Sequence, residues 1–528
     1  MLKTNDLLDF NEASKWATEY LGKTVTPSNI SYLVSYGRIS KIGENGTVQV
    51  AKEELVKYYA GYKKSREYTW KKQLGEDLNW ALSFDQYSEA ETTKHVHRLH
   101  PYKGKFIPQL VEYFLDEHTD AFKKDTFFKP GDIVLDPFCG SGTTLVQASE
   151  LGINAVGVDV SAFNSLISNV KVQLVDLVAL QGHINEISIG LRKLVEGSHH
   201  IEFEERLLEL LYAYNSKHFP SPEYRRKVNQ REIDEKEYGR EHESSFLRQF
   251  NALVKEFGLQ VEQKTRGRFL DKWYLNPVRE EIDFVFGLIK KVKNPETKKI
   301  LTIILSRTIR SCRATTHADL ATLIDPVVAT YYCSKHGKIC KPLFSIVSWW
   351  ERYCVDTFKR FQQFSKLRTD TLQVCLNGDS RNLDISGALK LRSPGLSKLF
   401  QKQKIKGMFS SPPYVGLIDY HEQHAYAYDL FGFERKDDLE IGSMKRKQSR
   451  VAQQEYADGI AAVLRNSRKF LTKDFDVFLV ANDKYNLYPQ IAEESGMQIV
   501  NQYKRPVLNR TERDKAAYSE IIFHLRSK

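Results

Sequence analysis

The sequence is poor in cysteine and has no long hydrophobic run. Only six of its 528 residues are cysteine, and they are scattered, which excludes a disulfide-stapled fold and agrees with a reducing compartment. No segment approaches the roughly 20 apolar residues that a membrane-spanning helix requires. The N-terminal stretch MLKTNDLLDF lacks the pattern of a signal peptide. We therefore expect a cytoplasmic protein without a membrane partner.

Positive charge is what the sequence has in excess. Lysine and arginine number 78 against 67 aspartate and glutamate, which gives a net charge of +11 and an isoelectric point near 9.0. Such an excess favours a polyanionic partner such as nucleic acid, or an anionic membrane face, without deciding between them. The hydrophobic content of 41% and charged content of 27% are ordinary for a globular protein. The length predicts roughly two to four domains.

A glycine-containing turn, DPFCGSGTT from Asp136 to Thr144, carries the first chemical signal. It follows an apolar run and precedes a helical stretch, so we predict the order strand, turn, helix. Glycine permits positive φ and close approach of a ligand to the backbone, and the start of the helix offers unpaired N–H groups. A second strand beginning at Asn154 ends at Asp159, where nucleotide-binding folds place an acid for ribose hydroxyls.

The first 62 residues predict a separate small module. We expect helices over 11–20 and 27–36, then a hairpin with its turn at Asn45 and Gly46, then another helix. This order resembles a winged helix, although a small helical cap that only packs on its neighbour fits as well. The candidate DNA contacts on the recognition helix and its exit are Ser28, Asn29, Tyr32 and Arg38.

The rest of the chain predicts a sheet interrupted by a helical block. Residues 63–94 are polar and rich in lysine, which is typical of a linker or of a phosphate-contacting arm. Residues 179–368 predict a mainly helical insert, within which the charged run 225–243 is expected to be a surface stretch. The last two strand-like runs, 498–503 and 519–525, predict a hairpin that closes an open α/β sheet.

Two histidine-containing segments do not match the pattern of a metal site. His95, His97 and His100 have no cysteine or acid at ligand spacing beside them in the sequence. The segment 418–432, with its acids and histidines at 419–424, fits a helix that packs with its apolar face on the cofactor strand. We therefore predict no metal at the site that carries the chemistry.

A cysteine-rich segment is the stronger metal candidate. Cys333, His336 and Cys340, together with Cys312 upstream, could supply four ligands, although their spacing matches no standard zinc finger. Reduced, partly buried cysteines are the alternative, and the sequence alone favours it.

A second motif, SPPY from Ser411 to Tyr414, follows another strand-like run. Together, DPFCGSGTT and SPPY resemble the motifs of the amino-group DNA methyltransferases, which use S-adenosylmethionine (SAM). The resemblance implies a Rossmann-like class I methyltransferase sheet built from two parts of the chain, 95–178 and 369–528. It implies that a methyl group is transferred from SAM to an exocyclic amino group of a base that is flipped out of double-stranded DNA. The helical insert would recognise the DNA target.

The same resemblance implies which residues bind SAM. The aspartate and glycines of the DPFCGSGTT turn would shape the pocket for the amino-acid end, and residues 100–106 would complete its methionine side. Asp159 would bind the ribose hydroxyls, and Asp379 would accept from the adenine amino group. The expected SAM-binding residues are Tyr102, Lys105, Phe106, Asp136, Pro137, Phe138, Gly140, Gly142, Thr143, Thr144, Asp159, Val160, Asp379 and Ser380.

The chemistry of SPPY can also be argued from its residues. The amino group of cytosine or adenine is a poor nucleophile because its lone pair is delocalised into the ring. Acceptors aimed at its N–H bonds favour the pyramidal nitrogen that attacks a methyl group, and the Ser411 hydroxyl and Pro412 carbonyl are candidates. Pro413 stiffens the turn, and Tyr414 offers a ring on which the flipped base can stack. We expect these four residues to be catalytic.

The identity of the target base is left between two conflicting cues. In the family, a leading serine is more usual for N4-cytosine, whereas the order cofactor loop, insert, catalytic motif is more usual for N6-adenine. We favour N4-cytosine because the first residue of the motif touches the reacting amino group. The alternatives are an N6-adenine methyltransferase, a structured-RNA methylase, and a non-catalytic DNA-binding regulator with a methyltransferase fold. A cognate restriction endonuclease would be a separate partner protein.

Two further segments complete the prediction. Cys139 lies in the cofactor turn and not in a proline-cysteine motif at the catalytic strand, so we interpret it as a small packing residue and not as a nucleophile. Downstream, the basic stretch Lys445, Arg446, Lys447 and Arg450 fits either a loop that closes over DNA or a solvated loop.

Overall fold

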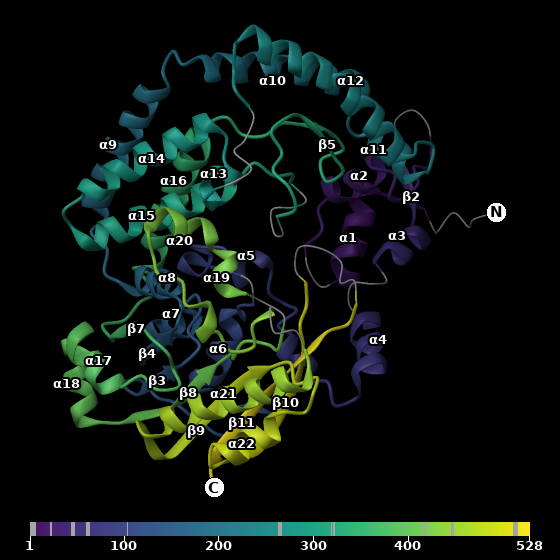
Figure 1. Cartoon of the computed structure of the whole chain (residues 1–528). Coiled ribbons are helices and arrows are strands. Elements are labelled where there is room, and N and C mark those ends of the chain that lie inside the picture. The colour runs from purple at the N-terminus through teal and green to yellow at the C-terminus, as the bar shows by residue number, and fades with distance from the viewer. Residues whose placement is uncertain are drawn as a thin grey trace.

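A single large sheet forms the lower half of the molecule in the computed structural model (Figure 1). The structure describes residues 7–21, 24–43, 48–59, 64–102, 104–261, 267–317, 319, 323–416, 419–444, 448–509 and 516–528. The sheet has seven strands in the order β10-β11-β9-β8-β3-β4-β7. They are β3 (Ile133–Asp136), β4 (Asn154–Asp159), β7 (Gln373–Asn377), β8 (Ile405–Ser410), β9 (Leu471–Ala481), β10 (Met497–Pro506) and β11 (Ser519–Ser527).

The strand directions confirm the predicted α/β sheet and its closing hairpin. Strands β7, β4, β3, β8 and β9 run parallel to one another. Strand β11 lies antiparallel between β9 and β10, and the pair β10 and β11 is the predicted hairpin. The parallel strands read as continuous apolar runs because both faces of the sheet are covered.

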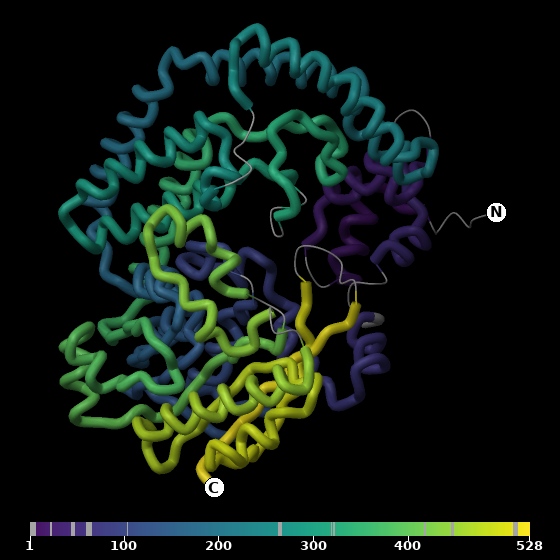
Figure 2. Tube along the Cα trace, viewed as in Figure 1, coloured from purple at the N-terminus to yellow at the C-terminus, as the bar shows by residue number. Residues whose placement is uncertain are grey.

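Helices cover the sheet on both sides (Figure 2). Side chains alternate along each strand, so Val134 packs into one core while Ile133 and Leu135 pack into the other. The helices of the first side are α6 (Pro108–Leu115), α7 (Thr143–Glu150) and α8 (Ala162–Val172). Those of the second side are α17 (Ile385–Arg392), α18 (Pro394–Lys402), α21 (Arg450–Arg468) and α22 (Tyr488–Glu494).

The chain between β4 and β7 is mainly helical. In Figure 1, α9, α10 and α12 form an arc at the top of the molecule, opposite the sheet. The helices are α9 (Leu177–Val195), α10 (His199–His218), α11 (Glu223–Asn229), α12 (Glu235–Glu256), α13 (Phe269–Trp273), α14 (Asn276–Lys291), α15 (Pro295–Ser311) and α16 (Val347–Phe364). A short hairpin, β5 (Tyr331–Cys333) and β6 (Lys338–Cys340), lies among them and was not predicted.

The charged run 225–243 lies at the surface, as predicted, and is helical for most of its length. It forms most of α11 and the first turns of α12. Asp234 starts α12, because its side chain accepts hydrogen bonds from the backbone N–H groups of Lys236 and Glu237 at 2.9 and 3.0 Å. A capped helix with one buried stripe tolerates a highly charged outer face.

The N-terminal region has its own small core and an unpredicted strand. Its elements are β1 (Leu7–Asp9), α1 (Phe10–Leu21), α2 (Pro27–Ser35), β2 (Gln49–Ala51) and α3 (Lys52–Tyr59). Strand β2 pairs with β1, whereas the expected hairpin partner contributes a single bridge between Ile42 and Gln49. The predicted turn at Asn45 and Gly46 lies outside the described residues. The end of α2 contacts the helical region, where Asn229 donates to the Tyr36 carbonyl at 2.7 Å.

Residues 64–94 pack against the sheet, which differs from the linker that their composition suggested. They form α4 (Lys64–Leu74), the 3-10 helix η2 (Trp80–Ser83) and α5 (Glu89–Thr92). Leu78 and Leu82 are buried, and Asn79 donates its backbone N–H to the Lys504 carbonyl of β10 at 2.7 Å. The segment is largely polar, but its apolar residues decide where it lies.

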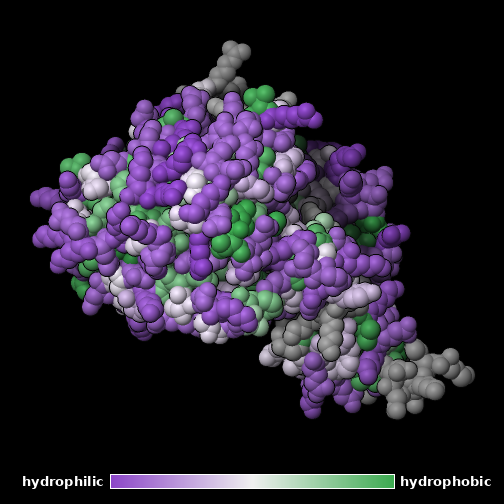
Figure 3. All heavy atoms as spheres, turned by 90° about the horizontal axis from the view of Figure 1, so that it is seen from below, coloured by the Kyte–Doolittle hydropathy of each residue, from purple (hydrophilic) through white to green (hydrophobic). Residues whose placement is uncertain are grey.

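The helices of the described residues can be compared with the length and hydropathy that a membrane-spanning helix needs. None of the helices there is both long and apolar enough to pass through a membrane. On the face seen in Figure 3, hydrophilic residues cover most of the surface and hydrophobic ones are scattered among them.

Candidate active site

The predicted site residues converge on one pocket at the carboxyl ends of the parallel strands. Strand β3 lies between β4 and β8. The helix that follows β3, α7, covers one side of the sheet, and α21, between β8 and β9, covers the other, which is the arrangement at which open α/β sheets bind ligands. The expected residues that line the pocket are Tyr102, Lys105, Phe106, Pro137, Phe138, Gly140, Thr143, Asp159, Val160, Asp379, Ser380, Ser411 and Pro413.

Other residues differ from the expected set. Those that were expected but do not line this pocket are Asp136, Gly142, Thr144, Pro412 and Tyr414. Those that line it without having been predicted are Gly104, Cys139, Ser141, Asn164, Tyr420, Leu439, Glu440 and Ile441. Cys139 and Ser141 belong to the DPFCGSGTT turn and could have been inferred from their neighbours, whereas no motif marks residues 439–441.

The cofactor turn needs its glycines for steric reasons. Gly140 has φ of +51°, and a Cβ there would lie 2.9 Å from the Tyr102 hydroxyl. Gly142 has φ of +75° and caps the N-terminus of α7. Any larger residue at Gly140 would fill the pocket beside Tyr102, so the turn leaves room for a ligand next to the backbone.

Asp136 and Thr144 join the two functional turns instead of lining the pocket. Asp136 is buried and accepts a hydrogen bond from the Ser410 hydroxyl at 2.5 Å. Burial raises the pKa of Asp136 to about 6. Thr144 donates to the Phe409 carbonyl at 3.3 Å. The turn after β3 is therefore tied directly to the strand that leads into SPPY.

Asp159 stands at the end of β4 with both carboxylate oxygens engaged. One oxygen accepts from the Gly140 backbone N–H at 2.8 Å, and the other accepts from the Ser161 N–H at 2.8 Å and from Asn164 at 3.2 Å. Burial raises the pKa of Asp159 to about 7 despite these donors. A carboxylate oxygen has two lone pairs, so Oδ1 is already filled by its two donors, whereas Oδ2 accepts from one donor and can still accept from a ligand hydroxyl.

Asp379 is held by an arginine that the sequence did not indicate. The Arg381 guanidinium donates to both carboxylate oxygens, at 2.9 Å to Oδ1 and 2.7 Å to Oδ2. Next to it, the Ser380 hydroxyl donates to the Pro137 carbonyl at 2.6 Å. This contact ties the turn after β7 to the cofactor turn, and the arginine orients the carboxylate on the pocket wall.

Aromatic and basic side chains of 102–106 form the next wall. Tyr102 stacks on Tyr420 with ring centroids 5.9 Å apart. The Lys105 ammonium donates to the His97 carbonyl at 2.9 Å, and burial lowers the pKa of Lys105 to about 8. Phe106 packs edge-on against Phe409 of β8 at 5.3 Å. The segment that precedes β3 in sequence is thus packed onto the catalytic strand.

The SPPY turn presents an acceptor to the pocket. The Ser411 hydroxyl donates its hydrogen to the Val480 carbonyl of β9 at 3.0 Å, so its oxygen lone pairs stay free to accept. Pro412 is buried and Pro413 lines the pocket. The Tyr414 hydroxyl donates to Glu520 of β11 at 2.7 Å, which fixes the ring beside the pocket and not inside it.

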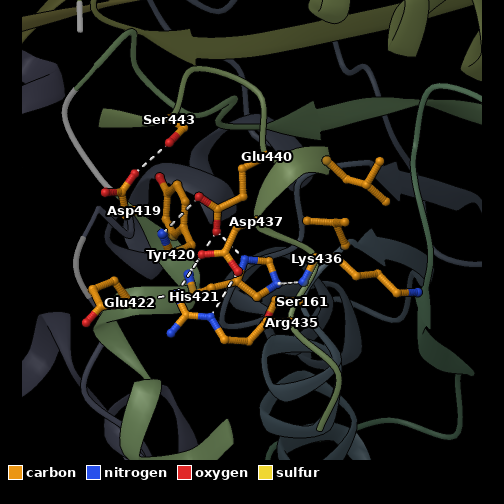
Figure 4. Close-up of polar contacts among 12 residues, drawn as sticks. Ser161, Asp419, Tyr420, His421, Glu422, Arg435, Lys436, Asp437, Glu440 and Ser443 are labelled. Atoms are coloured by element: carbon orange, nitrogen blue, oxygen red, sulfur yellow. Dashed lines mark hydrogen bonds and ion pairs between the residues drawn. The ribbon is translucent and has the colours of Figure 1, made fainter. Parts of the chain in front are cut away.

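The loop 436–443 is hydrogen-bonded to α19 (Tyr420–Gln423) and to the residue before it, and it forms the last wall of the pocket (Figure 4). Glu440 accepts from the His421 backbone N–H at 2.8 Å and also contacts the ring of His421. The Lys436 N–H donates to the other ring nitrogen of His421 at 3.2 Å. Ser443 donates to Asp419 at 2.7 Å, as Figure 4 shows. These contacts hold Leu439, Glu440 and Ile441 against the pocket.

The predicted helix over 418–432 is two short helices, because the chain bends between them. His424, which has φ of −117°, is the C-cap residue of α19 and the N-cap residue of α20 (Ala425–Phe431). His424 is buried, and burial lowers its pKa to about 3, so the ring is neutral at ordinary pH. It packs on Tyr102 and Phe163, which supports the pocket from behind.

The basic stretch after this loop is described only in part. Lys445, Arg446 and Lys447 lie outside the described residues, and Arg450 is the first residue of α21.

The histidines near 95–100 meet an acid that sequence spacing could not reveal. Glu150 of α7 lies 2.9 Å from the His95 ring and 3.9 Å from the His97 ring. The same carboxylate already holds a cation, because the Lys94 ammonium lies 2.6 Å from its second oxygen. His100 instead contacts the Ser306 hydroxyl of α15 at 3.0 Å.

The pocket fits the parts of SAM by its chemistry. Carboxylates at Asp159 and Asp379 provide acceptors for ribose hydroxyls and for an adenine amino group. Apolar side chains of Phe138, Val160 and Ile441 line the space between them, and the turn at Gly140 leaves the backbone open. When bound, SAM supplies an electrophilic methyl group on a sulfonium ion. Ser411 lines the same pocket, so donor and acceptor sites adjoin.

Comparison with known proteins agrees with this geometry. The family model described as DNA methylase matches residues 14–168. The chain is 46% identical over 525 residues to the type II methyltransferase M.MjaII of Methanocaldococcus jannaschii, covering 98% of this chain and 97% of that protein.

Two shorter matches concern part of the chain. One is the type II methyltransferase M.MvaI of Kocuria varians, 30% identical over 118 residues, 22% of this chain and 24% of that protein. The other is the tRNA (guanine(10)-N2)-dimethyltransferase of Methanocaldococcus jannaschii, 34% identical over 105 residues, 17% of this chain and 30% of that protein. Because the likeness to M.MjaII spans nearly the whole of both proteins, the chain belongs to the SAM-dependent amino-group DNA methyltransferases.

Proposed function

We propose that the protein transfers a methyl group from SAM to the N4 amino group of cytosine in double-stranded DNA, on a base flipped into the pocket. The observation that carries this proposal is the state of Ser411. Its hydroxyl hydrogen is committed to the Val480 carbonyl at 3.0 Å, and its oxygen borders the pocket that fits SAM.

A fixed acceptor at Ser411 suits the chemistry of an exocyclic amino group. An oxygen that cannot donate accepts one N–H bond of the base. The Pro412 carbonyl, which belongs to the same turn but does not line the pocket, is the proposed second acceptor. Two acceptors draw the nitrogen lone pair out of conjugation, so the amino group becomes a better nucleophile as it attacks. The rigid diproline turn keeps both oxygens in place without reorganisation.

A neutral acceptor at this position is the reason to favour cytosine. The first residue of the motif is serine, and serine in this place resembles the N4-cytosine enzymes. Adenine N6 is the alternative, since the order of cofactor loop, insert and catalytic motif resembles that of adenine enzymes.

DNA binding is assigned to the regions outside the sheet. In this proposal, 95–178 and 369–528 form the catalytic domain, and 179–368 recognises the target. Residues 1–62 are a winged-helix-like DNA contact, joined to the catalytic domain by 63–94, whose described part packs against the sheet. Tyr32 and Arg38 of the N-terminal region line a cleft together with Arg225, Lys335 and Lys338 of the helical region. Cations and aromatic rings in one cleft suit a phosphate backbone.

The relatives named type II methyltransferases suggest a biological setting. We infer that the protein belongs to a restriction–modification or related system in the cytoplasm, in which a cognate restriction endonuclease is a separate chain. Expression of a candidate endonuclease in a host that lacks the modification tests this setting, because the unmodified DNA would be cut, whereas co-expression of this protein would protect it.

Nucleoside analysis tests the target base directly. The purified protein is incubated with SAM and bacterial DNA, the DNA is digested to nucleosides, and methylated products are separated by mass spectrometry. We expect N4-methylcytosine, and a Ser411→Ala protein as control should form at least about a hundredfold less. N6-methyladenine would contradict the cytosine assignment, and specific DNA binding without transfer would support the non-catalytic regulator instead.

A further inference from the structure

Four metal-binding side chains meet outside the active site, at the β5–β6 hairpin of the helical region. They are His317, Cys333, His336 and Cys340, and one ligand atom from each lies within 4.8 Å of all the others. Both cysteines are buried and carry free thiols. His317 is half-buried and His336 is exposed, so the cluster lies just beneath the surface.

The hairpin brings three of these side chains together. Tyr331 pairs with Cys340 and Cys333 pairs with Lys338, so the two cysteines project from the same face of the hairpin. The turn folds back on itself, because the backbone N–H groups of His336 and Gly337 both donate to the Cys333 carbonyl, at 3.1 and 2.7 Å. This turn carries His336 over that face, where its Nδ1 lies 3.4 Å from the Cys340 sulfur.

The fourth side chain comes from the segment that follows α15, and a tyrosine orients it. The Tyr331 hydroxyl lies 2.7 Å from Nδ1 of His317 and accepts from the His317 backbone N–H at 3.2 Å. With Nδ1 engaged, Nε2 is the nitrogen left to bind a metal. A hydrogen bond to the second ring nitrogen is the usual support of a metal-binding histidine. The two imidazole rings stand 4.3 Å apart by their centroids.

The donor set indicates the kind of ion. Two thiolates and two imidazoles are the ligands of tetrahedral zinc sites, whereas magnesium and calcium prefer oxygen. Four protein ligands leave no open position for substrate, which is typical of a structural and not a catalytic ion.

The structure also corrects the ligand set that the sequence suggested. Cys312 packs in the large core of the sheet and helices, whereas Cys333 and Cys340 lie in a separate small cluster. His317 takes the place that sequence spacing had given to Cys312.

We propose that His317, Cys333, His336 and Cys340 bind one zinc ion that ties the segment after α15 to the β5–β6 hairpin. The hairpin is also anchored to two long helices. Asn215 of α10 donates to the Ile339 carbonyl at 3.0 Å and accepts from its N–H at 2.9 Å, and Glu243 of α12 accepts from the Tyr332 N–H at 3.0 Å. The ion therefore braces the wall of the cleft that Tyr32 and Arg38 also line.

Metal analysis of the full-length protein tests this site. The protein is expressed with added zinc chloride, purified without chelators or a histidine tag, and analysed by inductively coupled plasma mass spectrometry. We expect about one zinc ion per chain. A Cys333→Ser, Cys340→Ser double variant should retain less than about a tenth of it. The matched controls Cys312→Ser and Cys354→Ser each remove a buried thiol outside the cluster and should keep the ion.

A second measurement covers the case in which the double variant does not fold. Wild-type protein is stripped with a chelator and titrated with cobalt chloride, whose absorption spectrum reports tetrahedral coordination by thiolates. We expect such a spectrum at one equivalent, and its bleaching when zinc chloride is added. The single variant His317→Ala should bind cobalt at least about tenfold more weakly.

Several results would overturn the proposal. Protein that is isolated without zinc and takes up neither zinc nor cobalt would do so. The same holds if Cys312→Ser loses the ion while the double variant keeps it, or if native mass spectrometry finds a disulfide between Cys333 and Cys340.

Discussion

The Tyr414 hydroxyl donates to Glu520 at 2.7 Å, across the sheet from the SPPY turn to the last strand. Glu520 in turn accepts from the Arg505 guanidinium at 3.1 Å, and Arg505 is buried. The arginine also donates to the Leu82 carbonyl at 3.2 Å. A chain of hydrogen bonds thus holds the aromatic ring of the catalytic motif in one orientation, which suits a ring on which a flipped base stacks.

Substitutions at Tyr414 should separate the ring from its hydroxyl. Tyr414→Ala removes the stacking surface and is expected to lower methyl transfer about 10- to 100-fold, while SAM affinity changes little. Tyr414→Phe keeps the ring and should retain most of the activity, with a loss of about 1 kcal/mol in the free energy of unfolding. Single-turnover rates and denaturant unfolding measure the two effects. Equal losses of transfer in both variants would contradict a stacking role.

Glu520→Gln should destabilise the fold more than Tyr414→Phe. The glutamate neutralises a buried arginine, and loss of one partner leaves the other charge unpaired. We expect the free energy of unfolding to fall by about 3 kcal/mol. Thermal and urea unfolding measure this change. A matched control is Glu493→Gln, whose partner Lys528 is half exposed and which should have little effect.

Substitutions at Ser411 and at Asp159 should affect different steps, methyl transfer and SAM binding respectively. Ser411→Ala is expected to lower transfer about 100-fold with nearly unchanged SAM affinity, because the proposed role of the serine is to contact the base. Asp159→Ala should instead weaken SAM binding about 10- to 100-fold, because its carboxylate would accept from the ribose. Isothermal titration and single-turnover assays distinguish the two. If both variants lost only SAM binding, the proposed roles would be wrong.

The affinity for SAM should fall as the pH is lowered through neutrality. Burial raises the pKa of Asp159 to about 7, so the carboxylate form, which is proposed to accept from ribose hydroxyls, predominates only above that pH. If only this form binds, affinity should be about tenfold weaker at pH 6 than at pH 8. Calorimetric titration at the two pH values measures it. Asp159→Asn cannot ionise and should abolish the difference, and an equal dependence in that variant would assign it to another group.

Cys139→Ser should retain methyl transfer. Cys139 lines the pocket, but burial raises the pKa of its thiol, so little of the nucleophilic thiolate exists at neutral pH. Its sulfur lies 3.7 Å from the Ser168 hydroxyl, and a serine would fit the same space. Transfer assays with saturating SAM are expected to give rates within about twofold of the unchanged protein. Loss of transfer with SAM binding intact would show a chemical role.

The local parts of the site were predictable because their signals lie in short stretches of sequence. Glycines at 140 and 142 reveal a turn that needs positive φ, and each strand that feeds the pocket ends in a recognisable polar residue. Parallel strands share one carboxyl edge, so Asp159, Asp379 and Ser411 could be assigned to one pocket in advance. The two strand-like runs at 498–503 and 519–525 likewise predicted the antiparallel closing hairpin of β10 and β11.

What only the tertiary structure decided are contacts between residues far apart in the chain. Arg381 on Asp379, Glu520 on Tyr414 and the wall at 439–441 depend on how separate turns pack, and no spacing encodes that packing. The same reason explains why His317 and not Cys312 joins the cysteines of the β5–β6 hairpin. The sequence by itself determined the glycine turn after β3, the acids Asp159 and Asp379 near the ends of two other strands, and the SPPY turn after β8. Burial and side-chain contact, which exist only in the folded chain, determined how those groups are oriented and charged.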